Sequence, residues 1–234
     1  SLGANYLNYG NIQGYDINSL PTSNVKASNL LFSAGWGKTV NKSGTLATGA
    51  TFKYLQSTLA GYSASAPMFD LGVLISPKSD FLRNVRFAGT IRNRGPQIQY
   101  AGVSSSLPRQ IVVGAGYSAF GGNLKLDVDS IKPSDDSNYF ATGIEYRVFS
   151  LLRLRAGYSS KSNFVGNGFT YGLGLAFNQW NIDYAFVPYG DLGNTNRVSV
   201  GFRFGKAIEM KDAADQVDFS YNKAQSLYAH GRAI

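Results

Sequence analysis

The chain has 234 residues, of which 44% are hydrophobic, 14% aromatic and only 15% charged. This composition provides enough apolar material for a sizeable folded unit and argues against a disordered chain. The absence of cysteine excludes a disulfide scaffold, thiolate zinc sites and a cysteine nucleophile. The only histidine, His230, lies near the C-terminal end, so neither a histidine-based metal site nor a Ser-His-Asp triad is expected.

The charge balance is positive, with 22 Lys and Arg against 14 Asp and Glu and a formal net charge of +8. Such a balance permits nucleic-acid or anionic-membrane partners. The basic residues are spread along the chain and form no run, and no nucleic-acid-binding motif is present. We therefore expect no nucleic-acid partner. No window of about 18 apolar residues predicts a transmembrane helix.

Hydrophobic residues alternate with small or polar ones almost without interruption from about residue 28 to residue 205. A period of two residues predicts β-strands with one apolar face. In the first such segment Leu30, Phe32 and Trp36 share one face, while Ser33 and Gly35 share the other. The predicted strands cover residues 29–37, 46–54, 69–75, 85–92, 111–118, 124–129, 140–148, 152–158, 169–177, 182–186 and 197–204, with a twelfth around 6–15.

The segments between these strands contain the residues that turns require. Asn and Gly predict hairpin connections at residues 41–44, 121–123 and 166–168. Longer polar loops are predicted at residues 57–66, 104–109, 133–138 and 188–196. Consecutive strands joined in this way predict an all-β, antiparallel meander.

The predicted strand number decides which face looks outward. About eight strands make a barrel interior that side chains just fill, and twelve or more enclose a space too wide for an apolar filling. An apolar face turned to lipid and a polar face turned inward resolve this, and closure leaves no unpaired backbone in hydrocarbon. Strands of about 9–12 residues are long enough to cross a bilayer at a tilt. We therefore predict a transmembrane antiparallel β-barrel over residues 1–205, with a soluble β-protein as the alternative.

Aromatic residues gather toward the ends of the predicted strands, as in the interfacial girdles of membrane barrels. They are Tyr54, Tyr117, Phe120, Tyr139, Phe149, Tyr158, Phe177, Trp180 and Tyr189.

The inward face of the predicted barrel carries charges on most strands. Its cations are Lys53, Arg86, Arg92, Lys125, Arg147, Arg153, Arg155, Arg197 and Arg203, and its anions are Asp70, Asp127, Asp129, Glu145 and Asp183. Two interpretations of this set stay open. The charges form interstrand salt-bridge ladders that stiffen the barrel, or they form a binding or conduction path for an anionic ligand. Glycines on the same face allow curvature or make room for loops and ligand.

Residues 206–234 differ in composition and predict a short C-terminal α-helix. Apolar residues at spacings of three and four make this helix amphipathic, with Gly231 after its end: Ala214, Val217, Tyr221, Ala224 and Tyr228. The stretch from Tyr221 to Gly231 also resembles the first helix and turn of a tetratricopeptide repeat. It is therefore either an interfacial helix or the start of a periplasmic helical domain. In the second case Tyr221, Ala224, Leu227 and Tyr228 are the expected partner-docking residues.

Three stretches of the barrel region carry a family resemblance. They are residues 53–57 with 60–64 and 70–72, residues 93–96 with 107–108, and residues 183–188 with 190–193 and 196–199. Together they resemble outer-membrane barrels of the PorV/PorQ kind, within the wider group similar to the fatty-acid transporter FadL. The resemblance implies a location in the bacterial outer membrane and fourteen strands in the complete protein. It also implies an N-terminal segment that enters the lumen.

The resemblance further implies a function as a membrane anchor, a scaffold or a secretion-associated binding component. Some members of the family work as shuttles that bind secreted proteins in type IX secretion. The expected partners are outer-membrane lipid and a periplasmic or secreted protein. The alternative is a FadL-like transporter or channel for hydrophobic or anionic small molecules, with a hydrophobic molecule in the lumen. Catalysis is not expected, because His230 lies outside the barrel, and neither a cofactor nor a metal is expected.

Overall fold

The computed structural model describes residues 1–41, 43–100, 102–161, 167–190 and 193–202. Nearly all regular structure in these residues is β-strand, apart from a 3₁₀ turn at Phe120–Gly122. The first seven strands are β1 (Leu2–Ile12), β2 (Val25–Thr39), β3 (Leu46–Leu59), β4 (Tyr62–Ile75), β5 (Val85–Arg94), β6 (Ile98–Tyr100) and β7 (Val103–Ser105). The others are β8 (Gln110–Ala119), β9 (Leu124–Pro133), β10 (Tyr139–Val148), β11 (Leu152–Ser159), β12 (Phe169–Phe177), β13 (Trp180–Pro188) and β14 (Asn194–Phe202).

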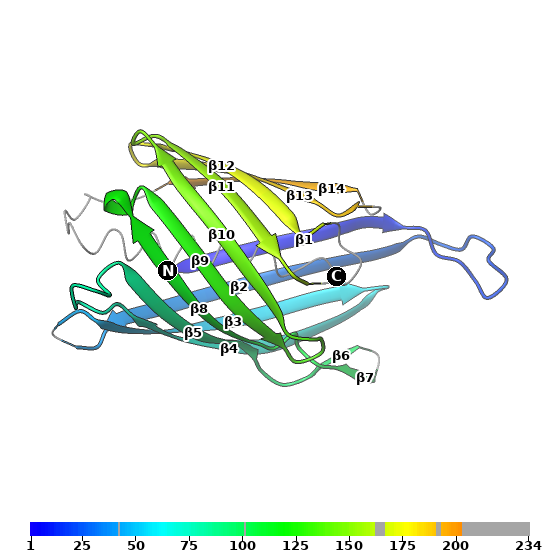
Figure 1. Cartoon of the computed structure of the whole chain (residues 1–234). Coiled ribbons are helices and arrows are strands. Elements are labelled where there is room, and N and C mark those ends of the chain that lie inside the picture. The colour runs from blue at the N-terminus through cyan, green and yellow to red at the C-terminus, as the bar shows by residue number, and fades with distance from the viewer. Residues whose placement is uncertain (42, 101, 162–166, 191–192, 203–234) are drawn as a thin grey trace. The chain divides into compact units, whose positions relative to one another are not determined.

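Twelve of these strands form one sheet in which hydrogen-bonded neighbours follow chain order (Figure 1). The order runs from β1 to β5, continues with β8, and ends at β14, while β6 and β7 form a separate two-stranded ribbon. The predicted all-β, antiparallel arrangement is therefore confirmed, and each of the twelve predicted strands corresponds to one strand of the sheet. The ribbon of β6 and β7 lies where only a loop was predicted.

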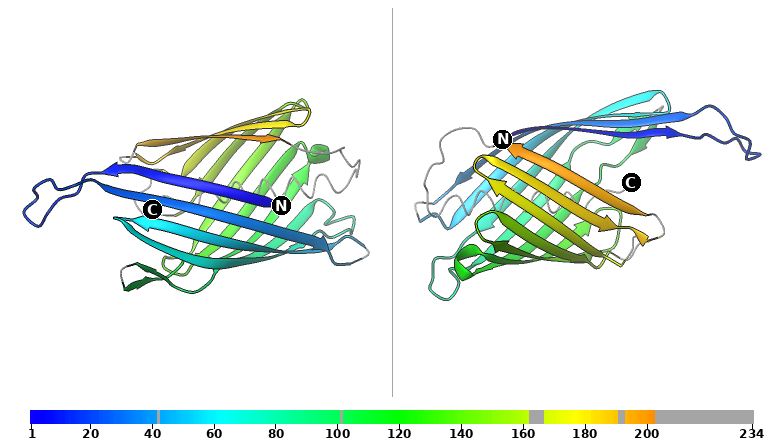
Figure 2. Two further views of the ribbon diagram at one scale, coloured as in Figure 1. Left: turned by 180° about the vertical axis from the view of Figure 1, so that it is seen from behind. Right: turned by 90° about the horizontal axis from the view of Figure 1, so that it is seen from above.

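By internal contacts the chain divides into two compact units. The first comprises residues 1–113 and 131–137, and the second comprises residues 114–130 and 138–234. In the first unit, β1 and β2 lie side by side, and the connection between them extends past the strand ends (Figure 2). In the second unit, β10 to β14 follow one another by antiparallel pairing.

Two of the predicted loops are wrong in extent. Residues 57–66 mostly continue β3 and β4, whose pairing reaches Leu59 and Tyr62. Only Ala60 and Gly61 make the turn, both with positive φ. The run is rich in Ser and Ala, which suggested a loop, but antiparallel pairing uses backbone groups and extends wherever a partner strand is present. The predicted loop at 188–196 is likewise shorter, because β14 begins at Asn194.

The strands expose their large apolar side chains and cover their charged ones. On β12, Tyr171, Leu173 and Leu175 are exposed, while Gly174 between them is buried. On β3, Phe52 is exposed but Lys53 is only 5% exposed. We call the exposed apolar side of each strand the outer face and the covered, charge-bearing side the inner face. This arrangement is the reverse of that in water-soluble β-proteins, whose apolar face forms the core.

The first unit contains a small apolar cluster on the inner face of β3 and β4. Leu55 of β3 and Met68 of β4 pack there with Ile98 and Leu107, both from the 95–109 segment that joins β5 to β8. This segment therefore covers part of the inner face of the first unit. The segment also positions the Pro108 carbonyl, which accepts a hydrogen bond from the Asn93 side chain.

None of the helical structure in the described residues is long and apolar enough to cross a membrane. The predicted C-terminal helix and the boundary of the barrel at residue 205 lie outside the described residues. β1 and β14 occupy the two ends of the strand order, and each has one neighbour in that order.

Candidate functional site: two charge networks on the inner face

The first network joins four segments of the first unit through Asn93. The Lys53 ammonium lies 2.5 Å from Asp70 Oδ2 and donates a 3.0 Å hydrogen bond to Asn93 Oδ1. The Asn93 backbone N–H donates to Asp70 Oδ1 at 2.8 Å, and its side-chain amide donates to the Pro108 carbonyl at 2.8 Å. Asn93 thus ties β3 and β4 to the 95–109 segment. We call this group the Asn93 network.

A β-bulge in β5 brings Asn93 into this position. Between the pairs Phe69–Arg94 and Leu71–Ile91, β5 advances by one residue more than β4. The extra residue is accommodated with Asn93 at φ 54°, in the left-handed region that asparagine tolerates better than most side chains. The bulge re-aims this side chain, so its amide reaches both Lys53 and the Pro108 carbonyl.

Gly95 lets the covering segment approach β4 closely. A Cβ at this position would lie 2.3 Å from the Pro67 carbonyl oxygen and 2.9 Å from Leu107 Cδ1. Since neither contact is sterically allowed, only glycine fits without a shift of the backbone. The 95–109 segment therefore depends on glycine at its start and on the Asn93 amide near its end.

Two of the stretches that carry the family resemblance meet in the Asn93 network. Sequence reasoning placed Lys53 and Asp70 on the inward face, and the structure joins them directly. It missed Asn93 as a site residue, because the bulge interrupts the two-residue alternation. The Asn-Arg-Gly-Pro run at the end of β5 was the available signal, since glycine and proline mark an interruption of a strand.

The second network lies in the second unit and is centred on Arg155 of β11. Its Nε donates to Glu145 Oε2 of β10, and its Nη1 donates to Asp183 Oδ1 of β13, both at 2.6 Å. Lys125 Nζ of β9 lies 3.6 Å from the other Glu145 oxygen. All four side chains are largely covered. We call this group the Arg155 network.

Two glycines of β12 make this network possible. Arg155 is directly opposite Gly172, and Gly174 is directly opposite Asp183. A Cβ on Gly174 would lie 2.7 Å from Asp183 Oδ1 and 3.3 Å from both terminal nitrogens of Arg155. The Arg155 side chain therefore passes over β12 where that strand has no side chains on the inner face. These two glycines make room for a side chain, which differs from the room for loops or ligand that the sequence suggested.

The other predicted inner-face charges occupy separate positions. Arg86 and Arg92 are half-buried on β5, and Arg92 Nε donates to Thr90 Oγ1 at 3.2 Å. Arg147 and Arg153 are direct cross-strand neighbours on β10 and β11. On β9 and β14, the remaining inner-face residues are covered to varying extents: Asp127, Asp129 and Arg197. The remaining predicted residues lie outside the described part of the chain: Arg203, Tyr221, Ala224, Leu227 and Tyr228.

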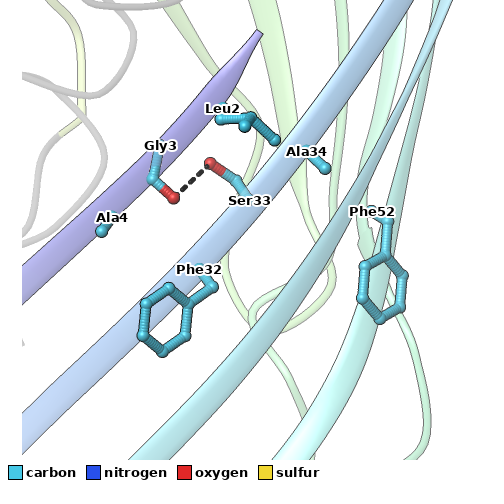
Figure 3. Close-up of a pocket in the computed structure, with 7 residues that line it drawn as sticks. All are labelled: Leu2, Gly3, Ala4, Phe32, Ser33, Ala34 and Phe52. Carbon is cyan, nitrogen blue, oxygen red and sulfur yellow. Dashed lines mark hydrogen bonds between the residues drawn. The ribbon is translucent and has the colours of Figure 1, made fainter.

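A shallow apolar hollow lies at the start of β1, next to β2 and β3 (Figure 3). Small residues such as Ala4 and Ala34 form its floor, and the rings of Phe32 and Phe52 flank it. The only hydrogen bond drawn there joins Ser33 Oγ to the Gly3 carbonyl at 3.4 Å. The hollow therefore offers mainly apolar contact area, and among its lining residues the Ser33 hydroxyl is the one polar side chain.

The chemistry of the two networks is that of paired charges. Within the described residues, no group of three or more His, Cys, Asp or Glu is placed to hold a metal ion. A buried ion pair is costly to break, because the loss of one partner leaves an uncompensated charge. Both networks therefore hold strands and a covering segment in fixed positions.

Fold and site together define an antiparallel β-sheet protein whose strands expose an apolar face and cover a face that carries ion-pair networks. No protein-family model matches the chain, and no curated protein matches it significantly.

Proposed function

We propose that this protein is a β-barrel of the bacterial outer membrane that acts as an anchor or scaffold for a protein partner, as secretion-associated barrels do. One observation carries the membrane part of the proposal: exposed apolar side chains alternate with covered charges along most strands. Left in water, this outer face would cost about 25 cal/mol for each Å² of exposed apolar surface. Lipid chains remove that cost, while the charges stay paired on the inner face.

Closure of the sheet follows from the same environment. An unpaired strand edge in hydrocarbon costs several kcal/mol for each polar backbone group. Twelve antiparallel strands satisfy the even number that single-chain bacterial barrels have. We propose that β1 pairs with β14, either directly or through two further strands that complete the fourteen of the barrels it resembles.

The covered inner face of the first unit supports an anchoring role rather than that of an open channel. Ile98 and Leu107 are packed against β3 and β4, and the Asn93 network fixes the segment that carries them. The partners that we propose are outer-membrane lipid and a periplasmic or secreted protein. We propose no catalytic activity, because the charges of the two networks are committed to ion pairs and no nucleophile lies beside a base in either network.

A charge placed in the middle of the outer face distinguishes a lipid environment from water. Leu173, the central residue of β12, is 48% exposed and pairs with Leu154 and Tyr184. We expect Leu173→Arg to destabilise the protein in lipid vesicles by about 2–4 kcal/mol, because arginine at the bilayer midplane must be desolvated. Urea titration of the vesicle-inserted protein, read by heat-modifiable gel mobility, measures this effect.

The matched control is Phe81→Arg, in the connection between β4 and β5. Phe81 is 92% exposed and lies outside the strands, so its replacement should change stability by less than about 0.5 kcal/mol. Equal and small effects of the two substitutions would contradict a lipid-facing sheet.

The scaffold role is tested by the C-terminal residues. We expect deletion of residues 209–234 to leave a folded barrel that no longer retains a periplasmic partner in a pull-down from the native outer membrane. A less severe variant replaces Tyr221 and Tyr228 with alanine and should weaken the same association. A partner retained by both variants would remove the tail from the proposal.

A second candidate function is the passage or binding of an anionic or hydrophobic small molecule. The charge balance of the inner face favours it, since the cations outnumber the anions among the described residues. These cations are Lys53, Arg86, Arg92, Lys125, Arg147, Arg153, Arg155 and Arg197, against Asp70, Asp127, Asp129, Glu145 and Asp183. Planar-bilayer conductance, or solute uptake, separates this function from anchoring alone.

A further inference from the structure

Three turns of the second unit carry exposed aromatic side chains. The turns connect β8 to β9, β10 to β11 and β12 to β13, and they have four, three and two residues. Phe120 of the first turn is 76% exposed, and Phe149 of the second is 88% exposed. Phe177 and Trp180 stand on either side of the third turn, and both are exposed. Alternate connections of an antiparallel meander lie at the same end of its strands, so these turns share one end of the second unit.

Backbone hydrogen bonds join the three turns into a row. The carbonyl of Asn123, in the first turn, accepts the Arg147 N–H just before the second turn, at 2.8 Å. The carbonyl of Leu151, in the second turn, accepts the Ala176 N–H just before the third turn, also at 2.8 Å. Each turn is therefore held directly beside the next one.

The row continues from the third turn to the end of β14. Trp180 is the cross-strand partner of Phe177 on one side and of Phe202 on the other. The ring centroids of Trp180 and Phe202 are 4.7 Å apart. These three residues extend the outer apolar face of their strands up to the turns. We define the aromatic rim as Phe120, Phe149, Phe177, Trp180 and Phe202.

Two rings of the aromatic rim are presented by an unfavourable backbone conformation. Phe120 has φ 52° and Phe149 has φ 53°, in the left-handed region that bulky side chains rarely adopt. Glycine adopts this conformation without a steric penalty. Strained residues of this kind gather at functional positions. Since both rings are exposed, packing against the described part of the protein does not offset the strain, and a contact outside the protein is needed.

The composition of the turns favours lipid as that contact. Residues 120–123, 149–151 and 178–179 include no charged residue, and their polar side chains are Asn, Ser and Gln. Such groups can hydrogen-bond to headgroups without bringing a charge close to hydrocarbon. Tryptophan, with an apolar ring and an N–H donor, suits the boundary between hydrocarbon and water. The aromatic rim is also continuous with the outer face, for which a lipid contact is already proposed.

We propose that the aromatic rim lies in the layer where phospholipid headgroups meet the acyl chains, and that the turn tips Phe120 and Phe149 are immersed there. This goes beyond an aromatic girdle at the strand ends, because the turns themselves then do not project into water. The second unit ends level with the membrane surface at this end. The inference rests on the proposed membrane barrel and adds the depth at which the barrel is held.

The test is depth-dependent quenching of tryptophan fluorescence, with the full chain inserted into phosphatidylcholine vesicles. The lipids carry bromine either near the headgroup or near the end of the acyl chains. Trp36→Phe leaves Trp180 as the single tryptophan. With Trp180→Phe added, Phe149→Trp puts the probe at a turn tip and Leu173→Trp puts it in the middle of the outer face. We expect blue-shifted emission throughout, with shallow bromine quenching the Trp180 and Phe149→Trp proteins more and deep bromine quenching the Leu173→Trp protein more.

The Leu173→Trp probe separates failure of this inference from failure of the membrane proposal. If it is quenched but the Phe149→Trp probe emits as in water and is quenched by neither lipid, the inference is overturned and the membrane-spanning sheet stands. The rim would then be a surface open to a protein partner. Stronger quenching of the turn tip by deep bromine would also overturn the inference. If neither probe is quenched, the proposed membrane barrel fails as well.

Phe149→Gly gives a second readout that needs no added tryptophan. Glycine relieves the left-handed backbone but removes the ring. We expect the urea midpoint of the vesicle-inserted protein to fall, because burial of a phenylalanine ring in an apolar environment contributes more than relief of one strained residue. Asn178→Gly is the matched control, since Asn178 has φ 52° in the third turn and no ring, and its midpoint should rise. A raised midpoint for both variants would contradict the lipid contact.

Discussion

Replacement of Gly95 by alanine is expected to displace the 95–109 segment and to destabilise the folded protein by about 1–3 kcal/mol, the range of overpacked sites. The added methyl would lie 2.3 Å from the Pro67 carbonyl oxygen. The oxygen belongs to the paired backbone of β4 and the methyl carbon is fixed by the backbone of residue 95, so no side-chain rotation relieves the contact. The shift should also separate Leu107 and Ile98 from Met68, which removes the apolar cluster of the first unit.

Equilibrium urea unfolding and limited trypsin digestion at Arg109 measure this effect. Arg109 is already exposed, but displacement of the segment should free its hydrogen-bonded backbone for cleavage and lower the urea midpoint. Gly89→Ala is the control, because Gly89 lies on β5 just before the segment and its Cβ would meet only Val73 Cγ1 at an ordinary 3.6 Å. An unchanged midpoint and digestion pattern for Gly95→Ala would mean that the segment is not held against β4.

Removal of the Asp70 carboxylate is expected to cost about 3–5 kcal/mol, because it leaves the charge of Lys53 buried without its counter-ion. The side chain of Lys53 is 6% exposed, so water cannot replace the carboxylate. Asp70 also accepts the Asn93 backbone N–H, and its loss loosens the bulge that aims the Asn93 amide. Asp70→Asn is the direct variant, and guanidinium unfolding is the measurement.

Addition of Lys53→Met to Asp70→Asn should recover most of the lost stability, since both buried charges are then gone. Asp80→Asn, in the exposed connection between β4 and β5, controls for the loss of one negative charge and should be neutral. If Asp70→Asn costs less than about 1 kcal/mol and the double variant is no better, the pair behaves as a solvated surface pair. That result would remove the Asn93 network from the account of stability.

Much of the sheet could be predicted from the two-residue alternation, because that period is a direct consequence of strand geometry. The predicted strand at 169–177 agrees with β12 at both ends. The alternation fails where polar or small residues form strand, as at Ser57 and Ala64, which are partners in the β3–β4 pair. It also fails for the three-residue strands β6 and β7, which are too short to show a period.

For the candidate sites, the sequence predicted only that their residues share the inner face of the sheet. Alternation places Lys53, Asp70 and Arg155 on the inner face, but it says nothing about which strands pair in which register. The contact of Arg155 with Asp183 spans two strand intervals and exists only because glycines lie between them. Alternation alone does not assign Asn93, since a bulge changes the face of one residue, and the glycine and proline that follow it are the signal for that interruption.

The passage of Arg155 over β12 also bears on how the second unit assembles. The hairpins β10–β11 and β12–β13 each close through local turns, but the ion pair from Arg155 to Asp183 forms only when the two hairpins meet in one alignment. A slip of one residue would bring Leu173 under the guanidinium instead of a glycine, and the pair could not close. The glycines therefore select one alignment of the two hairpins, because only the correctly aligned pair gains the contact between Arg155 and Asp183. A misaligned pair lacks this contact and separates more easily.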